Sequence, residues 1–197
     1  MSKSPQMIPP EMLIEAYCSG IFPMAMDDGG IGWFSPDPRA IIPLEDFHVP
    51  HGLKRALRKN IFEIRIDTAF AKVMRECAAR EETWISEDII GSYCELHRRG
   101  YAHSVEAWKD GKLAGGLYGV SLGAVFFGES MFHHATDASK VALCALVERM
   151  LKSGFKMLEV QWVTPHLQAF GAIEIPRDDY LKRLRACLKV RCEFPAK

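Results

Sequence analysis

Two apolar, strand-like runs of this chain each contain polar side chains that could do chemistry. The run at residues 126–132 carries Glu129, and the run at residues 157–163 carries Glu159 and Gln161. A polar group buried in such a run is costly unless it has a partner, so these exceptions mark a candidate site. Glu159 and Gln161 lie two positions apart, which places them on one face of a strand. The alternative for this pair is a solvated strand face.

The pattern of apolar and turn residues predicts the elements that must position these side chains. The expected bounds are strand 62–66, a helix from Asp67 or Thr68 through Cys77, a helix from Ser86 through His97, strands 103–108, 113–120 and 124–132, a helix from Asp137 to Gly154, strand 155–163, a short helix, strand 172–175 and a helix from Arg177. A helix between neighbouring strands implies a parallel pair joined to the antiparallel strands. We therefore expect an α/β fold (α+β mixed sheet) with the element order of an acetyltransferase-like (GCN5-related) domain.

The first sixty residues have a different character. After an unstructured start, residues 9–20 predict a short helix, with proline at its entry and glycine at its exit. Residues 21–50 are rich in Pro, Gly and Asp with interspersed aromatics, which predicts a compact irregular layer. Residues 51–59 predict a basic helix, so we expect a small N-terminal domain over residues 1–60 and the main domain over residues 61–197.

Composition narrows the class of protein. The 197 residues include 25 basic and 25 acidic side chains, so no overall charge attracts the protein to nucleic acid or to a membrane. The six cysteines are scattered without a Cys-x-x-Cys pair, and we expect them to be reduced in a cytosolic, soluble protein. His133 and His134 are adjacent, so on a strand they face opposite ways, and no third ligand accompanies them. We expect neither a metal nor a cofactor.

Several specific blocks between Leu13 and Leu184 occur in one order. They are Ala16-Tyr17, Gly20-Ile21-Phe22-Pro23, Trp33-Phe34-Ser35-Pro36-Asp37-Pro38-Arg39-Ala40, Thr83-Trp84-Ile85, His103-Ser104-Val105-Glu106, Gly115-Gly116-Leu117-Tyr118-Gly119-Val120, Gly128-Glu129-Ser130-Met131-Phe132, Ala138-Ser139-Lys140 and Glu174-Ile175-Pro176-Arg177. As an ordered set they closely resemble the leucyl/phenylalanyl-tRNA–protein transferases.

The resemblance implies an activity and its partners. The family transfers leucine or phenylalanine from aminoacyl-tRNA to the α-amine of proteins beginning with Lys or Arg, which marks those proteins for degradation as N-degrons. It also implies an acetyltransferase-like catalytic domain after a small N-terminal domain, and a cytoplasmic monomer. Relative to many members, the chain lacks a Gly-rich N-terminal extension and an aromatic C-terminal tail, and we expect weaker tRNA docking as a result.

The resemblance also assigns roles to the polar side chains of the two runs. It implies that Gln161 orients the attacking amine and that the acid at position 159 helps to take its proton, directly or through a neighbour. The family acid is Asp, so Glu159 is one methylene longer, and a shift of about 1 Å in a catalytic group can cost a factor of order a hundred. Glu129 corresponds to the glutamate that holds the α-amino group of the transferred residue. The alternative is a structural acid paired with Lys140 or a backbone amide.

Further positions match the binding surfaces of the family. The family's side-chain pocket corresponds to Met24, Leu117, Phe126, Leu146, Met150 and Leu158, and we expect this pocket to accept Leu, Phe and Met. The family residues that surround the terminal adenosine of tRNA correspond to Trp84, as a stacking platform, and to Tyr17 and Tyr93. The basic residues that contact the tRNA backbone correspond to Lys54, Arg55, Arg58 and Lys59. Without the resemblance, Leu146, Met150 and Tyr93 would be read as core, and the four cations as a solvated helix face.

The sequence leaves two alternative functions open. The first is a CoA-dependent N-acetyltransferase, but the segment before the helix at 137, residues 133–136, has no glycine with which to hold a pyrophosphate. The second is a diverged tRNA- or degron-binding paralogue without catalysis, which the unusual Glu159 and the short chain ends favour.

Overall fold

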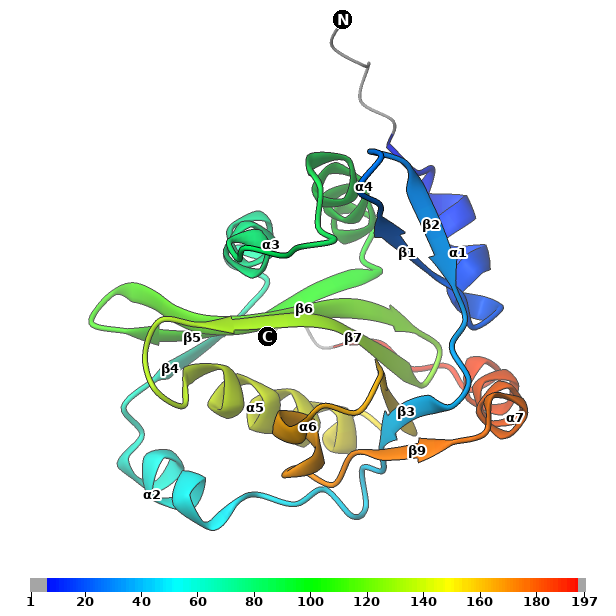
Figure 1. The fold of residues 1–197 in the computed structure, drawn as a ribbon. Coiled ribbons are helices and arrows are strands. Elements are labelled where there is room, and N and C mark those ends of the chain that lie inside the picture. Colours follow the sequence, from blue (N-terminus) through cyan, green and yellow to red (C-terminus); the bar gives the residue numbers. More distant parts are fainter. Residues whose placement is uncertain (1–6, 195–197) are drawn as a thin grey trace, which may run out of the picture.

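Within residues 7–194, the part that this computed structural model describes, a seven-stranded mixed sheet forms the centre of the molecule (Figure 1). Its strand order is β4 (Glu63–Ile66), β5 (Ala102–Lys109), β6 (Lys112–Leu122), β7 (Val125–His133), β8 (Met157–Gln161), β3 (Arg39–Ile42) and β9 (Ile173–Ile175). Neighbouring strands are antiparallel except for β7 and β8, which are parallel. The predicted mixed α/β sheet, its antiparallel meander and its parallel pair are confirmed. The unstructured start predicted for the chain falls largely on residues 1–6, outside the described part.

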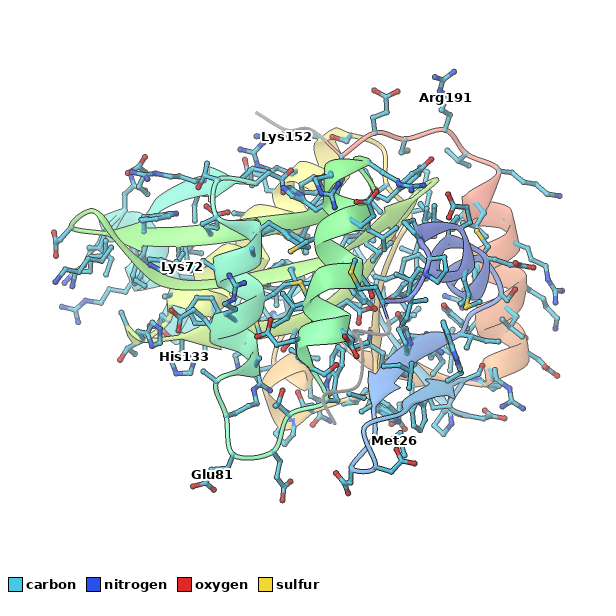
Figure 2. The ribbon with its side chains drawn as sticks, turned by 90° about the horizontal axis from the view of Figure 1, so that it is seen from above. Met26, Lys72, Glu81, His133, Lys152 and Arg191 are labelled. Atoms are coloured by element: carbon cyan, nitrogen blue, oxygen red, sulfur yellow. The ribbon has the colours of Figure 1, made fainter. Side chains whose placement is uncertain are left out.

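Helices cover both faces of this sheet. They are α1 (Pro10–Cys18), α2 (His51–Lys59), α3 (Phe70–Ala78), α4 (Glu87–Arg98), α5 (Ala138–Lys152), α6 (Pro165–Gln168) and α7 (Arg177–Leu188). Helices α3 and α4 cross the strands on one face (Figures 1 and 2), and α5 lies on the opposite face with α2 packed against it. Ser86 caps α4 by accepting from the Ile89 N–H, and Gly154 follows α5 with φ +79°, as the sequence predicts.

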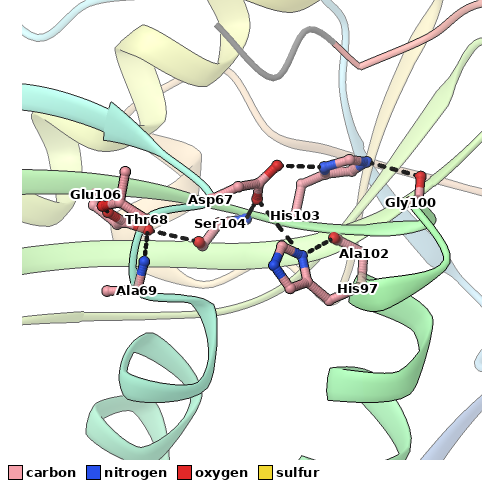
Figure 3. Close-up of polar contacts among 9 residues, drawn as sticks. All are labelled: Asp67, Thr68, Ala69, His97, Gly100, Ala102, His103, Ser104 and Glu106. Atoms are coloured by element: carbon pink, nitrogen blue, oxygen red, sulfur yellow. Dashed lines mark hydrogen bonds and ion pairs between the residues drawn. The ribbon is translucent and has the colours of Figure 1, made fainter.

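The start of α3 differs from the prediction that Asp67 or Thr68 caps it. The cap position is Ala69, and no side chain caps the helix there. The Asp67 carboxylate instead accepts from the Ser104 N–H at 2.8 Å and from His103, while the Thr68 hydroxyl donates to the buried Glu106 (Figure 3). These two side chains therefore link the end of β4 to β5. They hydrogen-bond to buried polar groups of β5, which need partners, and not to the free N–H groups at the start of α3.

The segment expected to be an irregular layer contains three short strands. Strands β1 (Phe22–Ala25) and β2 (Ile31–Phe34) form a separate hairpin, and β3 enters the main sheet between β8 and β9. Each strand has only four residues, and the many Pro and Gly residues around them obscure any alternation. The main sheet thus includes residues that precede position 60. The division of the chain near that position stays a prediction.

Candidate active site

The parallel strands at the centre of the sheet separate and leave a cavity. The pairing of β7 with β8 begins with Val125 opposite Met157 and ends with Phe127 opposite Glu159. On the other side of β7 the register shifts, because Gly128 faces Gly119 and Ser130 faces Tyr118 while Glu129 has no cross-strand partner. Such a bulge re-aims side chains and is common next to active sites. A cavity of about 420 Å³ opens at this point.

The cavity gathers many of the predicted site residues from distant parts of the chain. The predicted residues that line it are Met24, Trp84, Leu117, Glu129, Leu146, Leu158 and Gln161. Its walls are mostly apolar, and Leu143 and Val160 extend them beyond the predicted set. Leu143 could have been found from the sequence, because it lies three residues before Leu146 on the same face of α5. The arrangement suits an apolar side chain held beside a small number of polar groups.

Glu129 is the buried acid of this cavity, with 7% of its surface exposed. Its Oε1 accepts from the Tyr17 hydroxyl at 2.7 Å and from Gln161 Nε2 at 3.2 Å. Its Oε2 is buried and has no hydrogen-bond partner among the described residues. Burial raises the pKa of Glu129 to about 8, although the bond from Tyr17 opposes this. Lys140 pairs with Asp137 at 3.1 Å, and among the described residues it forms no ion pair with Glu129.

An unpartnered carboxylate oxygen in a cavity wall has a clear chemical preference. A buried acceptor that lacks a donor is costly, and a ligand that supplies an N–H removes this cost. A cationic ammonium suits it best, because it also stabilises the ionised carboxylate that burial disfavours. Glu129 is therefore placed to hold an amino group at the edge of an apolar pocket.

Gln161 and Glu159 take different positions although they are close in sequence. Gln161 lines the cavity, and its backbone is left-handed with φ +57°. Glu159 is completely buried and does not contribute to the cavity lining. Its Oε1 accepts from Arg39 Nε at 2.6 Å and from the backbone N–H of Gln161 at 2.5 Å. Burial raises the pKa of Glu159, and the Arg39 guanidinium opposes that shift.

Two residues predicted for the adenosine site and two predicted for the side-chain pocket lie behind the cavity wall. Tyr17 and Tyr93 are fully buried, and their hydroxyls are hydrogen-bonded to each other. The Tyr17 hydroxyl also donates to the Glu129 carboxylate. Burial raises the pKa of both tyrosines well above the ordinary value, so they remain donors. Phe126 of β7 and Met150 of α5 are fully buried in the core that α5 forms with the sheet. These four residues support the cavity and do not form its surface in this structure.

The four predicted tRNA-contact residues lie together on α2. Lys54, Arg55, Arg58 and Lys59 are all exposed, while Leu53 of the same helix is buried. Within residues 7–194, none of the four forms an ion pair. The helix therefore presents four uncompensated positive charges on the face of the sheet that α5 covers (Figure 1).

Arg80 and His166 are two basic residues of the cavity that the sequence did not mark. Arg80 donates to Ser130 Oγ at 3.2 Å and to the Met131 carbonyl at 2.9 Å. His166 lines the cavity from α6, and burial, helped by Lys140 and His133, lowers its pKa. Arg80 lies in a loop without helix or strand periodicity, and His166 follows the apolar run of β8 in a one-turn helix. Neither position carries a pattern that separates it from ordinary surface.

Metal-binding clusters and membrane-spanning helices are both absent from the described part of the chain. No group of three or more His, Cys, Asp or Glu side chains in residues 7–194 is arranged to hold a metal ion. Among the helices of the same residues, none combines the length and the apolar character that crossing a membrane requires.

Comparisons with known proteins give a consistent result. The family model described as leucyl/phenylalanyl-tRNA protein transferase matches residues 41–185, and the model of its N-terminal domain matches residues 6–37. The leucyl/phenylalanyl-tRNA–protein transferase of Herpetosiphon aurantiacus is 55% identical over 186 residues, which cover 94% of this chain and 97% of the relative. The protein of the same description from Akkermansia muciniphila is 54% identical over 185 residues, with coverage of 91% and 96%.

Solved structures give only distant likenesses. An aminoglycoside acetyltransferase from an uncultured soil sample has a TM-score of 0.43 at 15% identity, covering 66% of this chain and 89% of its own. The L-PGS protein of Bacillus licheniformis has a TM-score of 0.44 at 10% identity, covering 64% of this chain and 46% of its own. Scores at this level support no conclusion about function.

Proposed function

Because the chain belongs to the leucyl/phenylalanyl-tRNA–protein transferase family, we propose that its cavity binds the aminoacyl end of a charged tRNA for transfer to a protein N-terminus. The protein is an aminoacyltransferase. In the reaction, the amine of the acceptor attacks the ester carbonyl of the donor, a peptide bond forms, and the bond to the ribose oxygen breaks. The amine loses a proton, and the ribose oxygen gains one.

The donor site is proposed from an unsatisfied carboxylate oxygen in the cavity wall. Glu129 Oε2 has no partner among the described residues, and the α-ammonium of an aminoacyl group supplies one. The walls formed by Leu117, Leu146 and Leu158 then surround an apolar side chain, which fits leucine, phenylalanine and methionine. Trp84 lies in the same cavity and offers a flat surface on which the terminal adenine can stack.

The chemical step needs little beyond orientation, because an aminoacyl ester is already activated. Gln161 lines the cavity with its amide against Glu129, so it is placed to orient the attacking amine. Glu159 is enclosed behind Gln161, so its contribution passes through that residue and requires no contact with substrate. The exposed cations of α2 supply contacts to the phosphates of tRNA.

The finer properties of the reaction follow from the family resemblance. The proposed acceptors are proteins that begin with Lys or Arg, and the added residue creates an N-degron. The proposed setting is the cytoplasm, with the enzyme acting as a monomer.

A transfer assay tests the proposal. The protein is incubated with tRNA charged with labelled Leu, Phe or Met and with peptides that begin with Arg, Lys, Asp or Ala, and label is followed into peptide. Transfer of Leu to the Arg and Lys peptides is expected. Gln161→Ala should lower the rate, whereas Gln168→Ala, which removes an exposed amide from α6, serves as the matched control.

Other outcomes of this assay would change the assignment. An absence of transfer to every peptide, with tRNA binding intact, would favour a tRNA-binding protein without catalysis. Transfer to the Asp peptide in place of the Arg peptide would overturn the acceptor specificity while leaving the donor site in place. Transfer of a polar residue alone would contradict the apolar donor pocket.

A further inference from the structure

A buried arginine lies directly behind the wall of the cavity. Arg39 is completely buried at the start of β3. Its Nε donates to Glu159 Oε1 at 2.6 Å, and its Nη1 donates to the Gly20 carbonyl at 2.9 Å. The guanidinium carbon also lies 4.8 Å from the ring centre of Phe22 and 4.6 Å from that of Tyr180. Arg39 is thus fixed by a charge, a carbonyl and two aromatic faces.

The same carboxylate oxygen that accepts from Arg39 also holds the backbone of Gln161. Glu159 Oε1 accepts the Gln161 N–H at 2.5 Å, and Gln161 is the residue with φ +57°. This left-handed conformation is uncommon for a residue other than Gly, Asn or Asp, so its occurrence at a Gln indicates that the surroundings impose it. The neighbour of Arg39, Ala40, is the cross-strand partner of Gln161, next to a shift in register. Strand β3 therefore contacts Gln161 directly through the backbone pairing of Ala40 and acts on it indirectly through the ion pair between Arg39 and Glu159.

The conformation of Gln161 decides where its side chain points. Beyond the left-handed residue β8 ends, and the Gln161 amide donates to Glu129 at 3.2 Å within the cavity. Arg39 and Glu159 do not line the cavity themselves. A carboxylate enclosed in this way and paired with a guanidinium has no route to a substrate proton, but it remains able to fix a neighbouring backbone amide.

We propose that Arg39 is a positioning residue for aminoacyl transfer, which acts through Glu159 to hold Gln161 in the conformation that presents its amide to the cavity. This inference rests on the proposed function, because it assigns Gln161 to the orientation of the attacking amine. It gives the Glu159 carboxylate a positioning role in place of a direct role in proton removal. It also makes the N-terminal segment, which supplies β3, a part of the catalytic machinery.

The variant Arg39→Lys tests this role, because it keeps the positive charge and removes the planar group that reaches Glu159 and Gly20 together. The matched control is Arg177→Lys. Arg177 Nη1 donates to the Ser35 carbonyl at 3.0 Å, so it also joins the N-terminal segment to the rest of the chain, but it does not line the cavity. Both variants are assayed with Leu-tRNA at a temperature where circular dichroism shows them to be folded.

If Arg39 positions Gln161, its substitution lowers kcat. If Arg39 only stabilised the fold, kcat of the folded variant would not change. Arg39→Lys should lower kcat by about ten- to a hundredfold while the Kd for Leu-tRNA changes less than about threefold, since small displacements of an orienting group have such effects. Arg177→Lys should leave kcat unchanged. In a Gln161→Ala background, Arg39→Lys should have no further effect on kcat, because no amide is left to position. Losses that multiply in the double variant would overturn the inference.

A second measurement does not depend on catalysis and separates this inference from the proposed function. Amide hydrogen exchange at Gln161, followed by NMR in the unliganded protein, should be at least about tenfold faster in Arg39→Lys than in the wild type or in Arg177→Lys. If Arg39→Lys does not fold, Glu159→Gln, which keeps the size of the side chain and removes its charge, should show the same faster exchange. Unchanged exchange at Gln161 would overturn the inference even in an active enzyme. Failure of transfer with altered exchange would overturn only the proposed function.

Discussion

Glu129→Gln should stabilise the free protein and should do so more strongly as the pH rises. The pKa of Glu129 is raised from 4.5 to about 8 by burial. The folded protein therefore keeps this proton up to about pH 8, whereas the unfolded chain releases it above pH 4.5. The stability linked to this group is fully present below the unfolded pKa and is lost progressively up to the folded pKa. The amide of the Glu129→Gln variant has no proton to lose, so the variant escapes this loss.

The size of the effect follows from the same pKa. Each pH unit between the unfolded and folded pKa values removes about 1.4 kcal/mol from the free energy of unfolding. Between about pH 6 and pH 8 the loss from Glu129 is thus about 2 kcal/mol, somewhat less than two full steps because the folded group begins to ionise near pH 8. For a chain of this length, about 2 kcal/mol corresponds to a change in Tm of about 4–8 °C.

The assay is urea or thermal unfolding of the wild type and Glu129→Gln at three pH values from about 6 to about 8. The comparison between the two proteins at each pH removes the contribution of every other titrating group. Glu148→Gln, at an exposed acid of α5, is the matched control and should show a nearly constant difference from the wild type. A Glu129→Gln difference that does not grow with pH would refute the conclusion that this carboxyl is held protonated by burial.

Three further outcomes follow from the cavity and its surroundings. Changing Lys54 and Arg58 together to Ala should weaken tRNA binding and lower the slope of log Kd against log salt concentration by about 2, and an unchanged slope would make them ordinary surface residues. Trp84→Ala should raise the Kd for Leu-tRNA by roughly ten- to a hundredfold, measured by filter binding, because base stacking contributes about 1–3 kcal/mol; an unaltered Kd would remove Trp84 from the adenosine site. Leu146→Val should raise the Phe-to-Leu ratio of kcat/KM about tenfold by enlarging the pocket, and a constant ratio would place Leu146 outside the donor pocket.

The sequence predicts the sheet and much of the cavity for identifiable reasons. The strands β5, β6 and β7 are largely apolar runs separated by turn residues, and the helix α5 has an apolar face long enough to recognise. Glu129 and Gln161 stand out because a polar residue interrupts an apolar run. The structure brings both to one cavity and adds the unpartnered oxygen of Glu129, which no sequence pattern contains.

The residues that support the site are harder to find from the sequence. Arg39 lies in a strand of only four residues, between two prolines. An arginine is ordinarily exposed, and the complete burial of Arg39 depends on its ion pair with Glu159, which lies 120 positions away in the sequence. Tyr17 and Glu129 are 112 positions apart, and their hydrogen bond likewise has no local signal. The left-handed conformation of Gln161 depends on tertiary contacts, because a Gln side chain has no local preference for positive φ.

The most direct test of the account compares how Leu-tRNA and the same tRNA carrying the α-hydroxy analogue of leucine bind to the wild type and to Glu129→Gln. The two ligands differ only in the group that Glu129 is proposed to hold. At about pH 7.5 the wild type should bind Leu-tRNA about ten- to a hundredfold more tightly than the hydroxy analogue, because the α-ammonium lowers the pKa of Glu129 and pairs with its ionised form, and a hydrogen bond to a charged group contributes about 1.5–3 kcal/mol. Glu129→Gln should bind the two with nearly equal affinity. Equal binding by the wild type, or an undiminished preference in the variant, would contradict the assignment of Glu129 to the donor amine.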